Sequence, residues 1–370
     1  MLQYLQLFKF SNLTKVINGT RKLTRGNHNM EDKKRKQHYV FQSYLSAWTI
    51  NDKLWCVRIG GAPFNTSTLN IAQERDFYRL RPLNDNEKRL YNLLLLKTQT
   101  DTKKAFLDHI DHYLLPLEML KKTRLIRQSL ETQFGGYDKI PVEIKAELLN
   151  LEKVADINVN NTEEDYYSII EGESVKWLDS LKKEISNFYY TVDTKITENR
   201  EFNDEKFNFL FFLCTQYYRT KAAKERWISI VKPILDDPRW SAFNISKEDI
   251  DLENLVHHVF WFFINTCAYA LRKMDSHLTI LVNDTGTPFI TSDQPVINLK
   301  ANYQNLNEET NDLVFYYPIS PNIAITVNDD NNNDKIMLNE QQVDVYNWAI
   351  VKSSYQNIFA DRKDIFERYK

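Results

Sequence analysis

The spacing of hydrophobic residues changes twice along this chain. Near both ends, short apolar runs are bounded by turn residues, a pattern typical of strands. Between Asn84 and Met274, apolar residues recur every three or four positions, which predicts long amphipathic helices. Strands from the two ends and helices from the middle indicate an α+β fold, with a mainly helical middle and antiparallel strands contributed by the N-terminal and C-terminal segments.

The predicted strands fall into hairpins. Turn residues at Asn51-Asp52 and 283–286, and the Pro318–Pro321 segment, each separate two apolar runs. The Asn/Asp-rich segment 328–334 is predicted to be a loop. The predicted strands are 47–50, 54–57, 66–71, 278–282, 289–290, 314–317, 323–327 and 358–360.

Capping residues and helix breakers set the expected limits of the helices. Asn84 begins one helix, Pro116 is expected to kink the next, and Gly135-Gly136 to end it. The predicted helices are 84–97, 101–134, 141–154, 162–190, 204–235, 246–274 and 340–353. The segment Phe260–Phe263 is apolar on all sides, which is typical of a central core helix.

Residues 1–29 lack the periodicity of the rest. We expect them to form a poorly ordered extension, with Met30 as the native start. Residues 30–370 are predicted to form a single α+β domain.

Composition narrows the class of protein. The 370 residues are 42% hydrophobic and 13% aromatic, enough for a sizeable core, and include only 8 glycines. Cys56, Cys214 and Cys267 lie far apart and form no CxxC pair, which favours a reducing cytoplasm over a disulfide framework or structural zinc. No apolar run approaches the roughly 20 residues that span a bilayer, so no membrane partner is expected. Neither GxGxxG nor GxxxxGK[ST] occurs, so no cofactor is expected.

A net charge of −2 hides a basic tract in residues 21–36. Seven cations stand there against Glu31 and Asp32: Arg21, Lys22, Arg25, Lys33, Lys34, Arg35 and Lys36. Such a tract can meet a phosphate backbone or an acidic membrane surface, whereas the simpler interpretation is a solvated, flexible tail.

Two polar residues in the strand-rich parts of the chain, His38 and Asp293, are candidates for a functional site. His38 follows the basic tract, and its ordinary pKa near neutrality suits an acid, a base or a phosphate ligand. The alternative is a structural histidine. Asp293 follows two hydroxyl residues between apolar runs, where its carboxylate either caps backbone donors or faces a pocket.

Other candidates lie on predicted helices. Gln216 and Arg219 are three residues apart and share a helix face, and Arg219 can hold a carboxylate or phosphate in a forked pair. The basic run that follows is interleaved with aromatics, as in proteins that bind single-stranded nucleic acid, although a solvated helix face is the commoner outcome. Its members are Lys221, Lys224, Arg226 and Trp227.

Two further groups of charged residues are candidates for a site. Arg75, between Glu74 and Asp76, can orient Asp293 or His38, or can form a surface ion pair. Another group has the helical spacing of metal ligands but no evident third or fourth partner, so no metal site is predicted. Its members are Asp108, His109, Asp111 and His112.

Five short segments in the same order resemble the bacterial DUF4238 family of uncharacterised proteins, over about residues 33–360. They are a QHYVPQFYL-like segment at 37–45, an ERDFY-like element at 74–78, Q-x-x-R-T at 216–220, TSDxPV at 291–296 and P-[LI]-S-P at 318–321. Phe41 replaces the proline of the family's first segment, so the rigid turn which that proline imposes is not expected here. The resemblance implies a set of polar positions that converge on one site, and an association with bacterial defence and toxin-like genes.

The leading hypothesis is therefore a cytoplasmic defence or toxin-like effector that acts on a phosphate-bearing substrate such as RNA, without a metal. For such a metal-independent ribonuclease, His38 is the expected general acid/base, Asp293 orients His38 or Arg219, and Gln216 stabilises a developing oxyanion. The expected substrate-binding residues are Arg219, Arg75 and Gln42. The alternative is a non-enzymatic binding or sensor protein in which these polar residues are structural; no partner protein is identified.

Overall fold

The computed structural model describes most of the chain after residue 31. The described residues are 32–96, 103–104, 107, 110–111, 113–190, 205–305, 308, 312–329 and 333–369. The predicted extension, 1–29, and the expected start at Met30 lie outside them. None of the described helices is long and apolar enough to cross a membrane.

The chain divides into two compact units, each built from separate stretches of sequence. The first unit comprises 1–37, 75–168 and 241–255, and the second comprises 38–74, 169–240 and 256–370. That residues 30–370 form a single domain stays a prediction.

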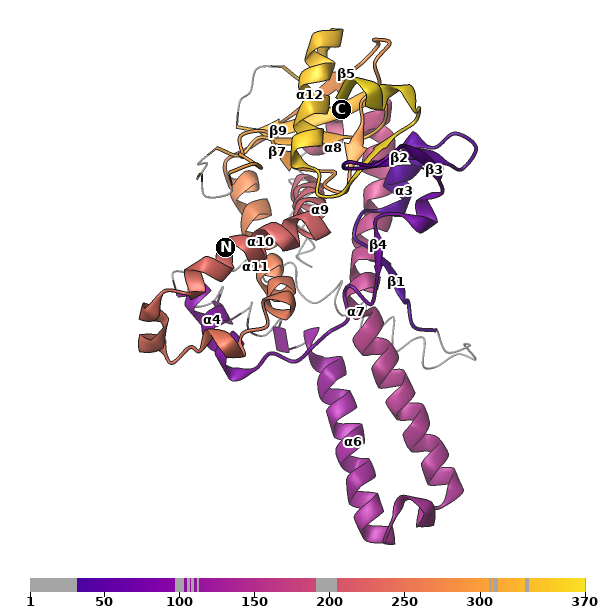
Figure 1. The fold of residues 1–370 in the computed structure, drawn as a ribbon, viewed down its shortest axis with the longest axis vertical. Helices are drawn as coiled ribbons and strands as arrows, with labels where there is room; N and C mark the ends of the chain where they lie inside the picture. The colour runs from indigo at the N-terminus through magenta and orange to yellow at the C-terminus, as the bar shows by residue number, and fades with distance from the viewer. Residues whose placement is uncertain are drawn as a thin grey trace, which may run out of the picture. The chain divides into compact units, whose positions relative to one another are not determined.

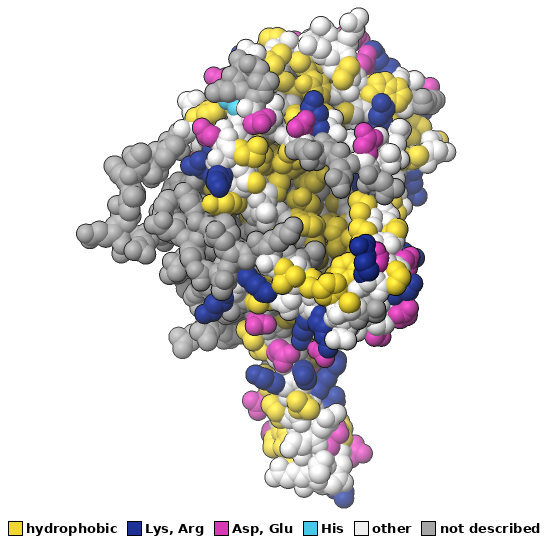
Figure 2. Space-filling view, turned by 90° about the vertical axis from the view of Figure 1, so that its left-hand side faces the viewer, with side chains coloured by type: hydrophobic (Ala, Val, Ile, Leu, Met, Phe, Trp, Pro, Cys, Tyr) yellow, Lys and Arg dark blue, Asp and Glu magenta, His cyan; other side chains and the backbone are white. Residues whose placement is uncertain are grey.

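The first unit is helical. Its main feature is a hairpin in which α6 runs beside α7 (Figure 1), and the ion pair Arg127–Glu152 (3.1 Å) joins the two helices. Figure 2 shows charges of both signs mixed with apolar side chains over this hairpin. The elements are α4 (Asp85–Leu94), α6 (Leu115–Phe134), η3 (Tyr137–Lys139), the part of α7 (Val142–Lys182) up to residue 168, η5 (Lys247–Asp249) and the start of α11 (Leu252–Lys273).

Local signals explain where these helices begin and end. Asn84 caps α4 in a reciprocal capping box with Glu87, so two backbone N–H groups that the helix leaves unpaired find acceptors. Gly135 ends α6 in the left-handed conformation (φ 72°), which glycine adopts without a Cβ clash. Pro116 lies in the first turn of α6, where its missing N–H costs nothing.

The second unit contains two sheets. One has the order β10-β5-β9-β8-β7 and is antiparallel except for the parallel pair of β10 and β5; the other is antiparallel, with the order β3-β2-β11-β6. The strands are β2 (Leu54–Arg58), β3 (Phe64–Thr66), β5 (His277–Val282), β6 (Thr291–Ser292), β7 (Ile297–Asn298), β8 (Phe315–Pro318), β9 (Ile323–Asn328), β10 (Lys335–Met337) and β11 (Asn357–Ala360). A separate pair, β1 (Lys36–His38) with β4 (Gln73–Arg75), forms where the chain passes from one unit to the other.

Helices complete the second unit. α12 (Glu340–Ser353) contacts β6 and β7 in the second unit (Figure 1). Its buried Val343 and Ile350 pack into a core that includes Phe289 and Ile297. The further helical elements are α3 (Gln42–Leu45), η1 (Ser46–Trp48), η2 (Thr68–Asn70), α8 (Asn187–Tyr190), α9 (Glu205–Tyr218), α10 (Lys221–Leu235), η6 (Asp364–Tyr369), the end of α7 and most of α11; η4 (Pro238–Phe243) spans the boundary between the units.

The predicted α+β fold is confirmed, with strands from both ends of the chain around a helical middle. The predicted helix 340–353 has the bounds of α12, and the hairpin of β8 and β9 is also as predicted. Helices 141–154 and 162–190 were wrongly separated, because α7 runs through 41 residues without a break.

Other predicted elements are corrected by the structure. The predicted helix 204–235 is two helices, α9 and α10, and the chain turns at Leu114 before α6 begins instead of bending at Pro116. The predicted strand 47–50 is mostly a 3₁₀ turn, and only Ile50 bridges across the Asn51-Asp52 turn to Lys53.

Strand partners also differ from the prediction in the second half. β5 pairs with β9 and β10 instead of with 289–290, and 66–71 is mostly a 3₁₀ turn. The predicted loop 328–334 is followed by β10, a strand that the pattern did not reveal.

Candidate functional site

Asp293 lies directly after β6 in the second unit, and its side chain is only 1% exposed. Its carboxylate accepts the backbone N–H groups of Tyr355, Gln356 and Asn357 at 2.8, 2.7 and 2.8 Å. Burial raises the pKa of Asp293 from its ordinary value, while these donors lower it. The carboxylate therefore clamps the turn between α12 and β11, with no oxygen turned to solvent.

Gln294, the next residue, joins the same turn to the break between α9 and α10. Its side-chain oxygen accepts from Thr220 (2.7 Å) and Arg226 (3.4 Å). Its amide nitrogen donates to the backbone carbonyls of Tyr217 (2.9 Å) and Val296 (2.8 Å). Thr220 is also the N-cap of α10, so this contact helps to decide where one helix stops and the next begins.

Arg219, at the same break, is a buried cation with a 2% exposed side chain. Its two terminal nitrogens donate to the carboxylate of Glu171 on α7 and to the backbone carbonyl of His38. Burial raises the pKa of Glu171, whereas Arg219 lowers it. The forked guanidinium thus binds the protein's own groups.

Tyr44 brings further segments to this region. Its hydroxyl lies 2.7 Å from the Thr291 hydroxyl and donates to the carbonyl of Pro318 at 2.8 Å. Its ring stacks on Tyr317, with ring centroids 4.9 Å apart. We call this set the motif network: His38, Tyr44, Arg219, Thr220, Thr291, Asp293, Gln294 and Pro318.

This network joins residues from the first, third, fourth and fifth of the short segments singled out in the sequence. The family model described as "Protein of unknown function (DUF4238)" matches residues 36–364. The chain belongs to this family. No curated protein and no solved structure matches this chain.

Two further residues of these segments contact distant parts of the chain within their own unit. In the first unit, Gln37 is fully buried; it accepts from the backbone N–H of Tyr78 (2.6 Å) and donates to the carbonyl of Asn160 (2.7 Å). In the second unit, Glu74 pairs with Lys221 at 2.7 Å. In this chain, these residues of the matched segments therefore hold distant parts of the sequence together.

The structure brings some of the predicted site residues together. His38 and Arg219 meet, but through the backbone carbonyl of His38; its side chain is half-buried. Gln216 is 1% exposed on α9, and its amide nitrogen has no hydrogen-bond acceptor among the described residues. Gln42 is half-buried and donates to the Thr68 hydroxyl at 3.3 Å.

Arg75 differs from the other predicted site residues. It belongs to the first unit, where its side chain is 76% exposed and lies 3.7 Å from its neighbour Asp76. Of the two predictions for Arg75, this geometry is that of a surface ion pair.

Three of the four described cations of the basic tract are ion-paired within the first unit, and the fourth, Lys36, is exposed. Three successive cations each meet an aspartate, so little of their charge is left for an external anion. The pairs are Lys33–Asp156, Lys34–Asp165 (2.5 Å) and Arg35–Asp76 (2.7 Å). The later basic run is also engaged in part, since Lys221 pairs with Glu74 and Arg226 donates to the Ser353 carbonyl.

No cluster of three or more His, Cys, Asp or Glu side chains able to hold a metal occurs among the described residues. Of the four residues with metal-ligand spacing, only Asp111 is described, and it is exposed; Asp108, His109 and His112 lie outside the described residues.

Sequence reasoning missed Glu171, Tyr44 and Gln294. Glu171 gives no local signal, because a glutamate in a long amphipathic helix is ordinarily solvated. Gln294 gives a weak local signal, because its polar side chain lies between two strongly apolar runs. If those runs are buried, the amide needs hydrogen-bond partners.

Proposed function

We propose that this DUF4238 protein is a binding or sensor protein in which the motif network is structural. The observation that carries the proposal is the complete internal use of Arg219 and Asp293. Arg219 holds Glu171 and a backbone carbonyl, and Asp293 holds three consecutive backbone N–H groups. Groups that are buried and engaged in this way gain little by exchanging their partners for a ligand.

The enzymatic hypothesis assigns a phosphate-bearing substrate such as RNA to the same residues. That hypothesis requires Arg219 to break its ion pair with Glu171 in order to bind phosphate. The Glu171 carboxylate would then be buried without a cation. The enzymatic hypothesis also needs a cationic surface, whereas Lys33, Lys34 and Arg35 are already paired. These contacts favour the binding role. The three cysteines are free thiols, which supports a proposed location in a reducing cytoplasm.

The test compares His38→Ala with Arg219→Met in the full chain. We expect His38→Ala to melt near the parent temperature, Arg219→Met to melt several degrees lower, and neither the parent nor a variant to degrade RNA. RNA breakdown by the parent that is lost in a normally folded His38→Ala protein would overturn the proposal. So would an Arg219→Met protein that melts like the parent.

A further inference from the structure

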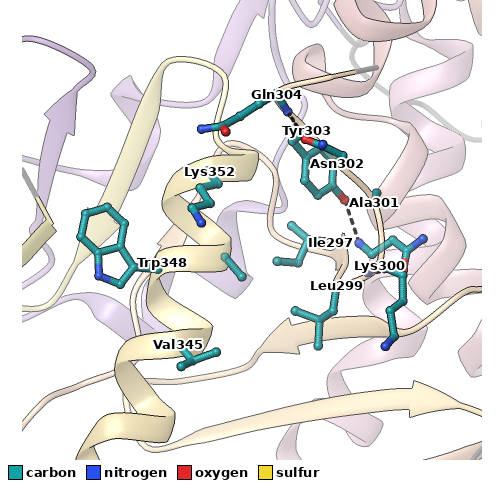
Figure 3. Close-up of a pocket in the computed structure, with 12 residues that line it drawn as sticks. Ile297, Leu299, Lys300, Ala301, Asn302, Tyr303, Gln304, Val345, Trp348 and Lys352 are labelled. Atoms are coloured by element: carbon teal, nitrogen blue, oxygen red, sulfur yellow. Dashed lines mark hydrogen bonds between the residues drawn. The ribbon is translucent and has the colours of Figure 1, made fainter. Parts of the chain in front are cut away.

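A pocket of about 620 Å³ opens beside α12 in the second unit, apart from the side chains of the motif network. Figure 3 shows its two walls: Val345 and Lys352 come from α12, while Leu299, Lys300 and Tyr303 come from the segment after β7. Its volume is in the range of pockets that hold small ligands, about 300–1,000 Å³.

The walls combine apolar surface with cations. Val345 is 68% exposed and, with Leu299 and the Tyr303 ring, gives an apolar surface that a flat ring could cover. Lys300 and Lys352 are exposed, and neither has an ion-pair partner in the part of the chain that the structure describes. None of the described side chains that line the pocket is acidic.

A third cation lies behind the pocket wall. The Arg226 guanidinium is 4.5 Å from the centre of the Tyr303 ring, on which it stacks. Its hydrogen bonds go to neutral groups, the Gln294 amide and the Ser353 carbonyl, and no carboxylate of a described residue forms an ion pair with it. The Asp293 carboxylate, which forms no ion pair with Arg226, offsets part of this charge at longer range, and the remainder adds to the positive potential at the nearby concave surface.

We infer that this pocket binds a small phosphate-bearing molecule with a flat ring, the chemistry of a nucleotide, with its phosphate at Lys352 on α12 and with Lys300 adding positive charge on the opposite wall. Lysines bind phosphate as point charges, so no glycine-rich loop is needed. The apolar walls would cover the ring. This inference rests on the proposed binding function and names its ligand class and site.

The position of the pocket also fits a sensor. Lys352 precedes Ser353, whose carbonyl accepts from Arg226, and Tyr303 stacks on the same guanidinium. A ligand that contacts Lys352 and Tyr303 therefore touches two neighbours of Arg226. Arg226 in turn donates to Gln294 of the motif network. A ligand bound in the pocket can therefore change the contacts of Arg226 and, through them, those of the motif network.

The experiment titrates the full-length protein with adenosine monophosphate, adenosine and inorganic phosphate by calorimetry. We expect the monophosphate to bind best, because only it offers both the charge and the ring. Lys300→Ala/Lys352→Ala should weaken its binding by about tenfold or more, since the phosphate loses its charge-assisted contact with Lys352 and the positive charge of Lys300. Lys232→Ala, which removes an exposed lysine of the same unit outside the pocket lining, should bind like the parent.

Three results would overturn the inference: no binding of the monophosphate by the parent, binding that the double variant retains, or adenosine binding as well as its phosphate. An RNA oligonucleotide that binds parent and double variant equally, while the monophosphate does not bind, would also contradict it. None of these outcomes alters the melting of Arg219→Met, so failure of the pocket and failure of the structural role remain distinguishable.

Discussion

Arg219 and Arg35 both pair with a carboxylate, but only Arg219 does so in the interior. The Arg219 and Glu171 side chains are 2% and 12% exposed, whereas those of Arg35 and Asp76 are 45% and 22% exposed. Water and salt screen the exposed pair Arg35–Asp76, so its contribution to stability is small. Breaking the buried pair Arg219–Glu171 is costly, because removal of either member leaves the other charge buried without a partner. Residue type does not distinguish the two regions; burial does.

The largest expected effect is at Asp293. Asp293→Ala leaves three backbone N–H groups of the turn after α12 without their acceptor. We expect the free energy of unfolding to fall by about 4 kcal/mol, measured by urea denaturation. Asp179→Ala, at an exposed carboxylate on α7, is the matched control and should change little. A loss at Asp293 as small as that of the control would mean that the clamp is not structural.

Arg219→Met tests the buried ion pair directly. We expect a loss of about 3 kcal/mol, because Glu171 is left buried without its cation. The double variant Arg219→Met/Glu171→Leu should recover much of this loss, since both charges are then gone. If the double variant is less stable than Arg219→Met, the pair is not the reason for the loss.

The same substitution should make stability depend on pH. Burial raises the pKa of Glu171, and Arg219 opposes this, so removing Arg219 raises that pKa further. The native state then binds a proton that the unfolded state has released, and stability falls as pH rises between the unfolded and folded pKa values. The loss caused by Arg219→Met should therefore be larger at about pH 8 than at about pH 5. Equal losses at both values would contradict a buried, unpaired Glu171.

The smallest expected effect is in the basic tract. Lys34→Ala removes a pair whose members, Lys34 and Asp165, are 40% and 32% exposed. We expect a loss of about 0–1 kcal/mol that shrinks further in high salt. A loss as large as that of Arg219→Met would remove the contrast between the two regions.

Prediction from sequence succeeded where the signal was local. Helix α12 begins after Asn339, which forms a capping box with Gln342, and the predicted bounds match the structure because these groups are neighbours in the chain. Asp293 was also expected, as one of two possibilities, to cap backbone donors, since a carboxylate after two hydroxyl residues commonly does so.

Prediction failed where a distant contact decides the outcome. Thr220 stands inside a continuous helical pattern, yet it begins α10 while its side chain binds Gln294, 74 residues away. β10 is too short for its pattern to be seen, and it becomes a strand by pairing in parallel with β5. The pocket beside α12 likewise has walls from separate segments.

The sequence by itself determined the α+β class, most helix ends and two of the polar residues that matter, Arg219 and Asp293, because periodicity, capping and turn chemistry act between near neighbours. Only the tertiary structure decided what those residues do. Whether a guanidinium faces water or a buried carboxylate depends on which segments meet around it, and Glu171, His38 and Arg219 come from three distant parts of the chain. Desolvation, which no local pattern encodes, turned a candidate phosphate ligand into an internal ion pair.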